Sequence, residues 1–384
     1  MVDKRNLRIA YFNGTMVEGQ DGVTRTLFKI IDFLKEKEIE SIFFSPLFKK
    51  ETTNKINIKK VSSIQLPFYK DYHIPIPKRN QLSFELDNFK PDILHFHSPC
   101  PLGQFAIKYA KSRNLPVVST YHTHFPSYSK YYKVDFIEHF GWSYLRKLYN
   151  SCDAVFVPSK TIISELQEHN FKNLIHLPNG IELKRFAPDF KNENWKFKHH
   201  IGNRKALLFV GRLVWEKDLK VLIEVNKYLK KIRDDYVFVF VGDGPARYDL
   251  QKNLPESVFL GRLYNDELSE AYASSDLFVF PSTTETFGIV ILEAMASGIP
   301  VICSNINGPA DIITNFYNGI LIKPNDAVSY ANQINLILNS PKLYKDIQLN
   351  ALNSVQQYEW NSIFEKMLDK YLEIIKDFSL QKIY

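Results

Sequence analysis

The stretch Ala206-Leu-Leu-Phe-Val-Gly-Arg-Leu-Val-Trp-Glu-Lys217 combines a short apolar run, a glycine turn and the approach to a helix. Its first five residues are apolar and strand-length, and an amphipathic segment at 218–230 follows the turn. A buried strand that passes through a glycine turn into a helix is the first half of a βαβ unit. This stretch therefore predicts a parallel sheet with helices on its faces.

The same alternation recurs on both sides of this stretch. Upstream, strand-length apolar runs lie at 7–12, 42–45, 93–96, 117–120, 154–158 and 174–177. Downstream, they lie at 237–241, 258–260, 277–280, 300–303 and 319–322. Helix-like segments separate them, so we predict an α/β protein with two Rossmann-like, doubly wound domains. Such sheets bind ligands at the carboxyl ends of their strands, and we expect these ends to face a central cleft.

The length of the chain and a change in pattern suggest where the domains divide. The 384 residues exceed what one hydrophobic core usually holds. We predict a first domain at 1–183, a polar linker without periodicity at 184–204, and a second domain at 205–358. Residues 359–384 form a final amphipathic helix in this prediction.

Composition narrows the class of protein. No apolar run approaches the roughly 20 residues that span a bilayer, and the polar first residues do not resemble a signal peptide. The cysteines Cys100, Cys152 and Cys303 are few, odd in number and far apart, which argues against a disulfide framework. We expect a cytoplasmic protein, either free or at the cytoplasmic face of a membrane.

The formal charge of +7 is unevenly distributed. Residues 1–183 hold 25 Lys and Arg against 18 Asp and Glu, whereas the remainder holds 24 of each sign. A basic surface favours anionic partners such as nucleic acid, acidic substrates or an anionic lipid leaflet. A chance imbalance of surface charge is the alternative interpretation.

Two cations follow the first strand of the second domain. Arg212 and Lys217 flank a turn that begins at Gly211, at a strand end and just before a helix. A helix amino terminus supplies amide donors, and the two cations neutralise phosphate oxygens. The arrangement suits a diphosphate, although a solvated loop with ordinary surface charges has the same composition.

Two carboxylates lie eight residues apart near the end of another strand. Glu285 falls on the loop after the strand at 277–280, and Glu293 lies within the otherwise apolar segment 289–295. A buried carboxylate is costly unless it meets hydrogen-bond donors. Sugar hydroxyls are such donors, so the pair is able to bind a ribose and a hexose together. An exposed glutamate on an amphipathic helix is the alternative.

These elements resemble glycosyltransferase family 4, whose members have the GT-B fold. The most specific match is Glu285-Thr-Phe-Gly-Ile-Val-Ile-Leu-Glu293 running on to 294–301, and the second is 211–217. The segments 241–245 and 177–181 also match. The resemblance implies a retaining enzyme, with the acceptor on the first domain, a nucleotide diphosphate sugar on the second, and a final helix that returns to the first.

The resemblance also assigns the donor residues. Arg212 and Lys217 would hold the diphosphate, and Glu293 the ribose. Glu285, with the backbone of Phe287 and Gly288, would contact the donor sugar. Arg262 lies in a stretch that resembles the family segment near the base, and Gly22 lies where the family has a glycine loop close to the diphosphate.

The first domain carries the expected acceptor side. Tyr121-His-Thr-His-Phe-Pro126 resembles the subgroup of diacylglycerol glycosyltransferases, sulfoquinovosyl diacylglycerol synthase and GDP-mannose-dependent mannosyltransferases. That likeness places His122 beside the donor sugar, where it would act with Glu285; a packing histidine is the alternative. His95 and His97 are expected to be structural or to line the acceptor site. The expected acceptor-side residues are Arg25, Thr26, Tyr121, His124 and Tyr128.

The aromatic and basic stretch 127–150 fits a membrane interface, a greasy acceptor groove or a core helix pair with a basic face. Together with the basic first half of the chain and the resemblance to the subgroup, this stretch leads us to expect a membrane lipid or a lipid-linked glycan as acceptor. We also expect peripheral binding of the first domain to an anionic membrane.

The expected reaction moves a hexose from a UDP- or GDP-sugar, which is the donor substrate, and requires no cofactor. The chain contains no Asp-x-Asp pair, the usual carboxylate pair for a divalent metal, so we expect transfer without a metal. A nucleotide-sugar epimerase of the same fold and a non-catalytic protein that binds anionic lipid are the alternatives. A dinucleotide oxidoreductase would need a Gly-x-Gly-x-x-Gly turn that the first strand lacks, and no nucleic-acid partner is expected.

Overall fold

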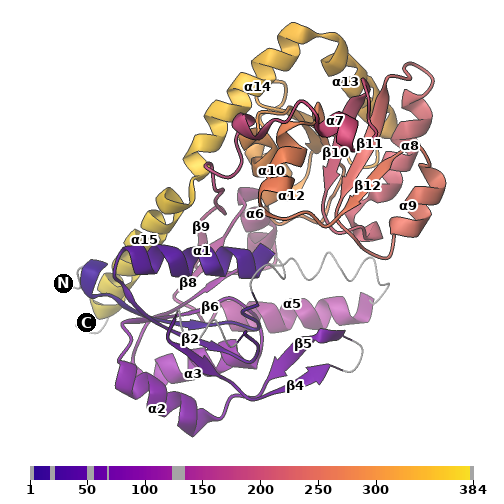
Figure 1. Ribbon diagram of the computed structural model, residues 1–384. Coiled ribbons are helices and arrows are strands. Elements are labelled where there is room, and N and C mark those ends of the chain that lie inside the picture. Colours follow the sequence, from indigo (N-terminus) through magenta and orange to yellow (C-terminus); the bar gives the residue numbers. More distant parts are fainter. Residues whose placement is uncertain (1–3, 18–21, 50–55, 67–68, 123–134, 381–384) are drawn as a thin grey trace. The chain divides into compact units, whose positions relative to one another are not determined.

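The computed structural model describes residues 4–17, 22–49, 56–66, 69–122 and 135–380 (Figure 1). The chain divides into two compact units, one of Met1–Asn179 with Trp360–Tyr384 and one of Gly180–Glu359. Each unit is built around a parallel sheet and is described by itself.

The sheet of the first unit is parallel throughout, in the order β3-β2-β1-β6-β7-β8-β9. Its strands are β1 (Arg8–Phe12), β2 (Glu40–Ser45), β3 (Ile58–Lys60), β6 (Ile93–Phe96), β7 (Val117–Thr120), β8 (Ala154–Val157) and β9 (Leu174–His176). A separate antiparallel pair consists of β4 (Ser63–Leu66) and β5 (Tyr69–Pro75).

Helices cover both faces of this sheet (Figure 1). One face packs against α1 (Gly22–Glu36) and α15 (Trp360–Leu380). The other packs against α2 (Arg79–Phe89), α3 (Pro101–Arg113), α5 (Asp135–Tyr149) and α6 (Lys160–Glu168). Successive residues of a strand point to opposite faces, so Tyr11 joins the first core and Phe12 the second.

Helix α15 is the last helix of the chain and belongs to the first unit, as the GT-B fold class predicted. Five of its buried side chains recur at helical spacing and join the core formed with α1 and the sheet; they are Trp360, Phe364, Met367, Leu368 and Tyr371. The Tyr371 hydroxyl lies 2.5 Å from His95 Nδ1 and 3.4 Å from the Tyr11 hydroxyl. The helix is therefore joined to the sheet by a buried polar contact as well as by apolar packing.

We expect Tyr371→Phe to lower the stability of the first unit by about 1–3 kcal/mol, because it leaves His95 Nδ1 buried without its partner. For a unit of this size, that corresponds to a melting temperature lower by roughly 2–10 °C in a calorimetric scan. Tyr236→Phe is the matched control, since it removes a comparable 2.7 Å hydrogen bond to Asn226 Oδ1 in the second unit. If both variants lowered the melting temperature of the same transition equally, the loss in Tyr371→Phe would not be due to the contact between α15 and the first sheet.

The sheet of the second unit is also parallel, in the order β12-β11-β10-β13-β14-β15. Its strands are β10 (Lys205–Val210), β11 (Tyr236–Val241), β12 (Val258–Gly261), β13 (Leu277–Phe280), β14 (Val301–Ser304) and β15 (Ile320–Ile322). Its helices are α7 (Trp195–Lys198), α8 (Leu219–Leu229), α9 (Arg247–Asn253), α10 (Asn265–Ala273), α11 (Ile289–Ala296), α12 (Asn307–Ile312), α13 (Ala327–Asn339) and α14 (Pro341–Val355).

The stretch 184–204, which the sequence predicted to be a linker, packs onto the second unit, and the chain passes between the units at 179–180 and 359–360. Trp195 is buried in the core of that unit. Lys196 Nζ lies 2.5 Å from Asp276 Oδ2, and the Asn192 amide donates to Ser274 Oγ at 3.0 Å. A single apolar anchor among polar residues produces no periodicity, so the sequence pattern did not reveal this packing.

Strand order reverses once in each sheet. In the first sheet the reversal lies between β1 and β6, and in the second it lies between β10 and β13. Open α/β sheets bind their ligands at the carboxyl ends of the strands beside such a reversal. The loops that follow these four strands are therefore where a functional site is expected.

Candidate functional site

The loop after β10 is fixed by a close backbone approach. A Cβ atom on Gly242 would lie 1.9 Å from the Gly211 carbonyl oxygen, and one on Gly244 would lie 2.4 Å from the Leu213 carbonyl oxygen. Gly242 also has a φ of +132°, which L side chains rarely adopt. Because only glycine fits there, the loop after β11 packs directly under the loop that carries Arg212 and Lys217.

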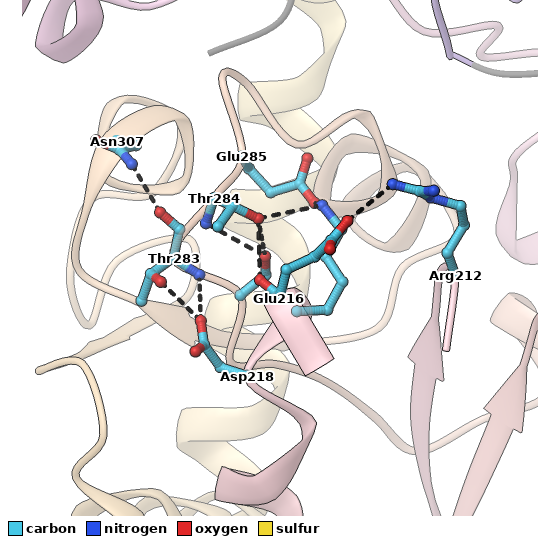
Figure 2. Close-up of polar contacts among 9 residues, drawn as sticks. Arg212, Glu216, Asp218, Thr283, Thr284, Glu285 and Asn307 are labelled. Carbon is cyan, nitrogen blue, oxygen red and sulfur yellow. Dashed lines mark hydrogen bonds and ion pairs between the residues drawn. The ribbon is translucent and has the colours of Figure 1, made fainter. Parts of the chain in front are cut away.

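Asp218 joins the loop after β10 to the loop after β13 (Figure 2). It precedes α8 with a φ of +54°. Its Oδ2 accepts hydrogen bonds from the Thr283 amide at 2.8 Å and the Thr283 hydroxyl at 2.7 Å. Asn307 Nδ2 donates to the Thr283 carbonyl at 2.8 Å. The two loops at the strand reversal are thus held together by buried and half-buried polar contacts.

Lys217 and Glu285 meet at this junction. The Lys217 Nζ atom lies 2.5 Å from Glu285 Oε1 and 3.5 Å from Thr284 Oγ1. The Thr284 hydroxyl donates to the Glu216 carbonyl at 3.1 Å. The Lys217 side chain is 12% exposed and that of Glu285 is 21% exposed, so solvent reaches both. The structure therefore brings together the predicted phosphate cation and the predicted sugar-binding carboxylate.

Arg212 lies on the same loop but extends into solvent. Its side chain is 64% exposed, and Nη2 lies 3.0 Å from Oε1 of the buried Glu216 (Figure 2). One guanidinium edge is engaged in this pair, and the remaining donors of the planar fork suit an oxyanion. Arg212 and Lys217 together give this loop two cations.

Glu293 lies in α11 with a side chain that is only 1% exposed. We expected sugar hydroxyls to be its hydrogen-bond donors, but the structure shows a donor from the protein. The buried Tyr272 of α10 donates its hydroxyl proton to Glu293 Oε2 at 2.7 Å. The burial of this carboxylate is thus compensated within the core of the second unit.

Of the other predicted donor residues in this unit, two lie in the loop after β13 and one lies farther along the sheet. Gly288 has a φ of +95° and begins α11, and the buried Phe287 packs edge to face with Tyr358 at a centroid distance of 5.9 Å. Arg262 is exposed and directly follows β12, which lies two strands from β10. Arg262 is thus the predicted donor residue farthest along the sheet from the strand reversal.

In the first unit, three histidines lie at the carboxyl ends of two neighbouring strands: His95 is in β6, His97 directly follows β6, and His122 follows β7. His95 Nε2 lies 2.8 Å from Thr120 Oγ1, and His97 Nδ1 lies 2.7 Å from His122 Nε2. Burial lowers the pKa of His122 to about 4 and holds the pKa values of His95 and His97 well below the usual range. All three rings are therefore neutral at pH 7.

The remaining predicted residues of the first unit, Gly22 on the donor side and the acceptor-side residues, are dispersed. Gly22 is the exposed first residue of α1, and its carbonyl accepts a hydrogen bond from the Thr26 hydroxyl at 3.0 Å. Arg25 is exposed, whereas Tyr121 is buried in the core. His124 and Tyr128 lie outside the described residues.

Most apolar side chains at the end of the aromatic stretch 127–150 pack in the core. Within the described side chains of α5, Trp142, Leu145, Leu148 and Tyr149 are buried, which favours the core interpretation for that part. Tyr144 is exposed, and its hydroxyl donates to the Pro99 carbonyl at 3.1 Å.

Sequence reasoning missed Asp218, Thr284 and Tyr272. Asp218 directly precedes a helix, a position that often marks a structural carboxylate. Thr284 and Tyr272 carried no such signal, because their partners lie 68 and 21 residues away in the chain. Within the described ranges, no cluster of three or more His, Cys, Asp or Glu residues is arranged to hold a metal ion. The helices described there include none long and apolar enough to cross a membrane.

Comparison with known proteins gives two family matches that together span most of the chain. The family described as Glycosyltransferase Family 4 matches residues 20–185, and the family described as Glycosyl transferases group 1 matches residues 191–354. A crystal structure of a glycosyltransferase from Rickettsia africae has a TM-score of 0.77 at 22% identity and covers 97% of this chain and 99% of that chain.

Several relatives have names that match the predicted subgroup. The GDP-mannose-dependent alpha-mannosyltransferase of Corynebacterium glutamicum is 29% identical over 97% of this chain and 90% of its own. The sulfoquinovosyl transferase SQD2 of Arabidopsis thaliana is 33% identical over 79% of this chain and 61% of its own. The alpha-monoglucosyldiacylglycerol synthase of Streptococcus pneumoniae is 28% identical over 77% of this chain and 70% of its own.

These matches confirm the predicted family and subgroup, and the two parallel sheets with helices on their faces confirm the predicted fold class. The chain belongs to glycosyltransferase family 4 and is a glycosyltransferase of the GT-B fold.

Proposed function

We propose that this enzyme is a retaining hexosyltransferase that moves a hexose from a UDP- or GDP-sugar to a hydroxyl of a membrane lipid or lipid-linked glycan. The observation that carries the proposal is the cluster of Lys217, Thr284 and Glu285 at the strand reversal of the second sheet. The names of two relatives, one GDP-mannose-dependent and one a synthase of a diacylglycerol glycolipid, support the donor and the lipid acceptor.

The donor is proposed to bind through a change of partners. Lys217 now pairs with Glu285. A diphosphate brings more negative charge than one carboxylate, so it draws Lys217 toward its oxygens, and Arg212 contributes the second cation. Glu285 then accepts hydrogen bonds from the hexose hydroxyls, beside the backbone of Phe287 and Gly288. Glu293 is proposed to bind the ribose, and Arg262 lies on the side of the base.

Catalysis is proposed to be mainly electrostatic. As the glycosidic bond breaks, charge accumulates on the leaving diphosphate, and Lys217 and Arg212 stabilise that charge. A diphosphate oxygen takes the proton of the acceptor hydroxyl on the same face of the sugar, which retains the anomeric configuration. His122, neutral at pH 7, orients the donor sugar. Because the two cations neutralise the diphosphate, we propose that no metal is required.

A donor screen tests this proposal. The protein is mixed with UDP-, GDP- and ADP-sugars, in magnesium or in EDTA, and its melting temperature is measured. A ligand at a hundredfold excess over its Kd stabilises the folded protein by about 2.7 kcal/mol. We expect the sugar of one nucleotide to raise the melting temperature of the second unit, by the same amount in magnesium and in EDTA. A shift only in magnesium would contradict metal independence, and recovery of epimerised donor would favour an epimerase.

Glu293→Gln separates the proposed ribose contact from packing. The amide keeps an oxygen for the Tyr272 hydroxyl but removes the charge, so we expect little change in melting temperature. Loss of a charged hydrogen bond to the ribose should weaken nucleotide binding by roughly 10- to 100-fold, measured by calorimetric titration. Tyr272→Phe is the control, and it should affect stability more than affinity. Unchanged affinity in Glu293→Gln would remove Glu293 from the donor site.

Peripheral binding to an anionic membrane is proposed for the first unit. The positive charge of the chain is concentrated in residues 1–183. The antiparallel pair β4–β5 adds an apolar element, because Ile64 and Ile74 are cross-strand partners that are 61% and 44% exposed. Exposed apolar side chains beside basic residues are typical of surfaces that enter the lipid interface.

We expect the protein to sediment with vesicles that contain phosphatidylglycerol, and to be released as salt rises. Replacing both Ile64 and Ile74 with serine should weaken vesicle binding by about tenfold or more, because their apolar surface no longer leaves water. Ile232→Ser, which alters an exposed isoleucine of the second unit, is the control and should bind as the wild type does. Equal vesicle binding by all three proteins would rule out this surface.

A further inference from the structure

His97 contacts His122, the histidine that the proposed function gives a role in orienting the donor sugar. It follows β6 at the strand reversal of the first sheet and is buried. Its Nδ1 lies 2.7 Å from His122 Nε2, and its ring stacks on that of His95 at a centroid distance of 4.0 Å. In the part of the chain that the structure describes, no hydrogen-bond partner lies near His97 Nε2.

The 2.7 Å contact between the two rings contains one hydrogen atom. Burial keeps both imidazoles neutral, and a neutral imidazole carries a hydrogen on only one of its nitrogens. Either His97 donates from Nδ1 to His122 Nε2, or His122 donates from Nε2 to His97 Nδ1. The choice fixes the tautomer of both rings.

The surroundings of His97 Nε2 decide between these arrangements. If His122 donates, the hydrogen of His97 must sit on Nε2, where it becomes a buried N–H group without a partner. An unmade hydrogen bond of a buried donor costs about 1–3 kcal/mol, and orphaned N–H groups are rarer than unsatisfied acceptors. If His97 donates, its Nε2 holds only a lone pair. The arrangement in which His97 donates to His122 is therefore favoured.

His95 cannot accept a hydrogen bond from an N–H group at His97 Nε2. Its Nδ1 is 2.5 Å from the Tyr371 hydroxyl and its Nε2 is 2.8 Å from Thr120 Oγ1, so both nitrogens are engaged. It contacts His97 through ring stacking instead. Helix α15 and β7 thus hold His95, and the His95 ring in turn holds the plane of His97.

We propose that His97 is a positioning residue that holds His122 in the tautomer with its hydrogen on Nδ1, so that His122 acts as a hydrogen-bond donor toward a sugar oxygen. The proposal rests on the proposed role of His122 in the transfer reaction. His122 Nε2 is occupied by the hydrogen that His97 donates, and Nδ1 already carries a hydrogen. Neither nitrogen is then available to take the proton of the acceptor hydroxyl, which leaves that step to the diphosphate.

Two variants test the positioning role. His97→Asn keeps an N–H group near the position of Nδ1, whereas His97→Leu fills similar space without a donor. Histidines are labelled with ¹⁵N, and long-range ¹H–¹⁵N spectra at pH 7 show which nitrogen of His122 is protonated. We expect Nδ1–H in the wild type and in His97→Asn, and a shift toward Nε2–H in His97→Leu.

Kinetics supply the second readout. With the donor found in the screen, kcat of His97→Leu should fall by roughly 10- to 100-fold, because orienting partners of a functional histidine have effects of this size. The donor KM should change little, and His97→Asn should retain most of the activity. A merely structural role would not produce this rescue together with the change of tautomer.

Each outcome decides the inference. Protonation of His122 at Nε2 in the wild type overturns it, whatever the activity, and so does a wild-type kcat in His97→Leu. The spectra need no turnover, so a protein that shows the Nδ1–H form but transfers no sugar refutes the proposed function and leaves the tautomer assignment intact.

Discussion

Replacing Lys217 with alanine lowers kcat/KM for the nucleotide sugar by about 10²- to 10³-fold, the usual effect of removing one preorganised donor to a developing negative charge. The Lys217 side chain is only 12% exposed, and its ammonium group lies beside Glu285 and Thr284. Without it, the diphosphate loses a cation and Glu285 is left without its salt-bridge partner. Initial rates of nucleoside diphosphate release, measured over a range of donor concentrations, give the ratio.

Lys227→Ala is the matched control for this prediction. Lys227 is an exposed lysine of the same unit and pairs with Glu224 on the surface of α8. Such surface pairs contribute little, so its loss should leave kcat/KM within about twofold. A similar loss of activity in both variants would point to a general effect of charge and would remove Lys217 from the proposed mechanism.

Mild acid should destabilise the first unit steeply. His95 and His97 are buried and neutral when folded, with pKa values well below 6.5, but each takes up a proton after unfolding. The unfolded chain therefore binds more protons, and stability falls as pH drops from 6.5 to 5. These two groups contribute roughly 2–3 kcal/mol per pH unit once the unfolded histidines are protonated, and His122, whose pKa is lowered to about 4 in the folded protein, adds to this loss.

Calorimetric scans at pH 7, 6 and 5 check this prediction. The transition of the first unit should move down by several degrees per pH unit. His200→Asn, which alters an exposed residue of the second unit, is the control and should leave the transition of the first unit where it is in the wild type. His97→Asn should reduce the slope, because asparagine takes up no proton. Equal stability of the first unit at pH 7 and pH 5 would contradict neutral, buried histidines.

The sequence predicted the architecture because its signals were local. Apolar runs of strand length, each followed by a helical pattern, predicted two parallel sheets, and the glycine turn at 211–217 predicted the loop after β10. Since Arg212, Lys217 and Glu285 follow strand ends, their common location at the edge of one sheet followed from topology. The match of the final helix to the family also predicted its return to the first unit.

The contacts that complete the site depend on distant residues. Tyr272 and Glu293 are 21 residues apart, and Thr284 contacts the Glu216 carbonyl 68 residues away, so no periodic pattern joins them. The sequence therefore suggested a ligand, and not a protein side chain, as the group that donates a hydrogen bond to Glu293.

The histidines show the same limit. Alternation along a strand places His95 and His97 on one side of the sheet, and both were expected to be structural or acceptor-lining. Which ring meets His122 depends on how neighbouring strands pair and on α15, whose Tyr371 holds His95 from 276 residues away. The tautomer of His122 therefore required the structure.

The most direct test of the central claim is a transfer assay with product analysis. The protein is incubated with the nucleotide sugar identified by the donor screen and with vesicles that contain diacylglycerol or a lipid-linked glycan. We expect nucleoside diphosphate and glycosylated lipid in equal amounts. NMR of the product should show the anomeric configuration of the donor, and EDTA should leave the activity unchanged. A protein that binds the nucleotide sugar but returns it intact, epimerises it or inverts the anomeric centre would contradict the account.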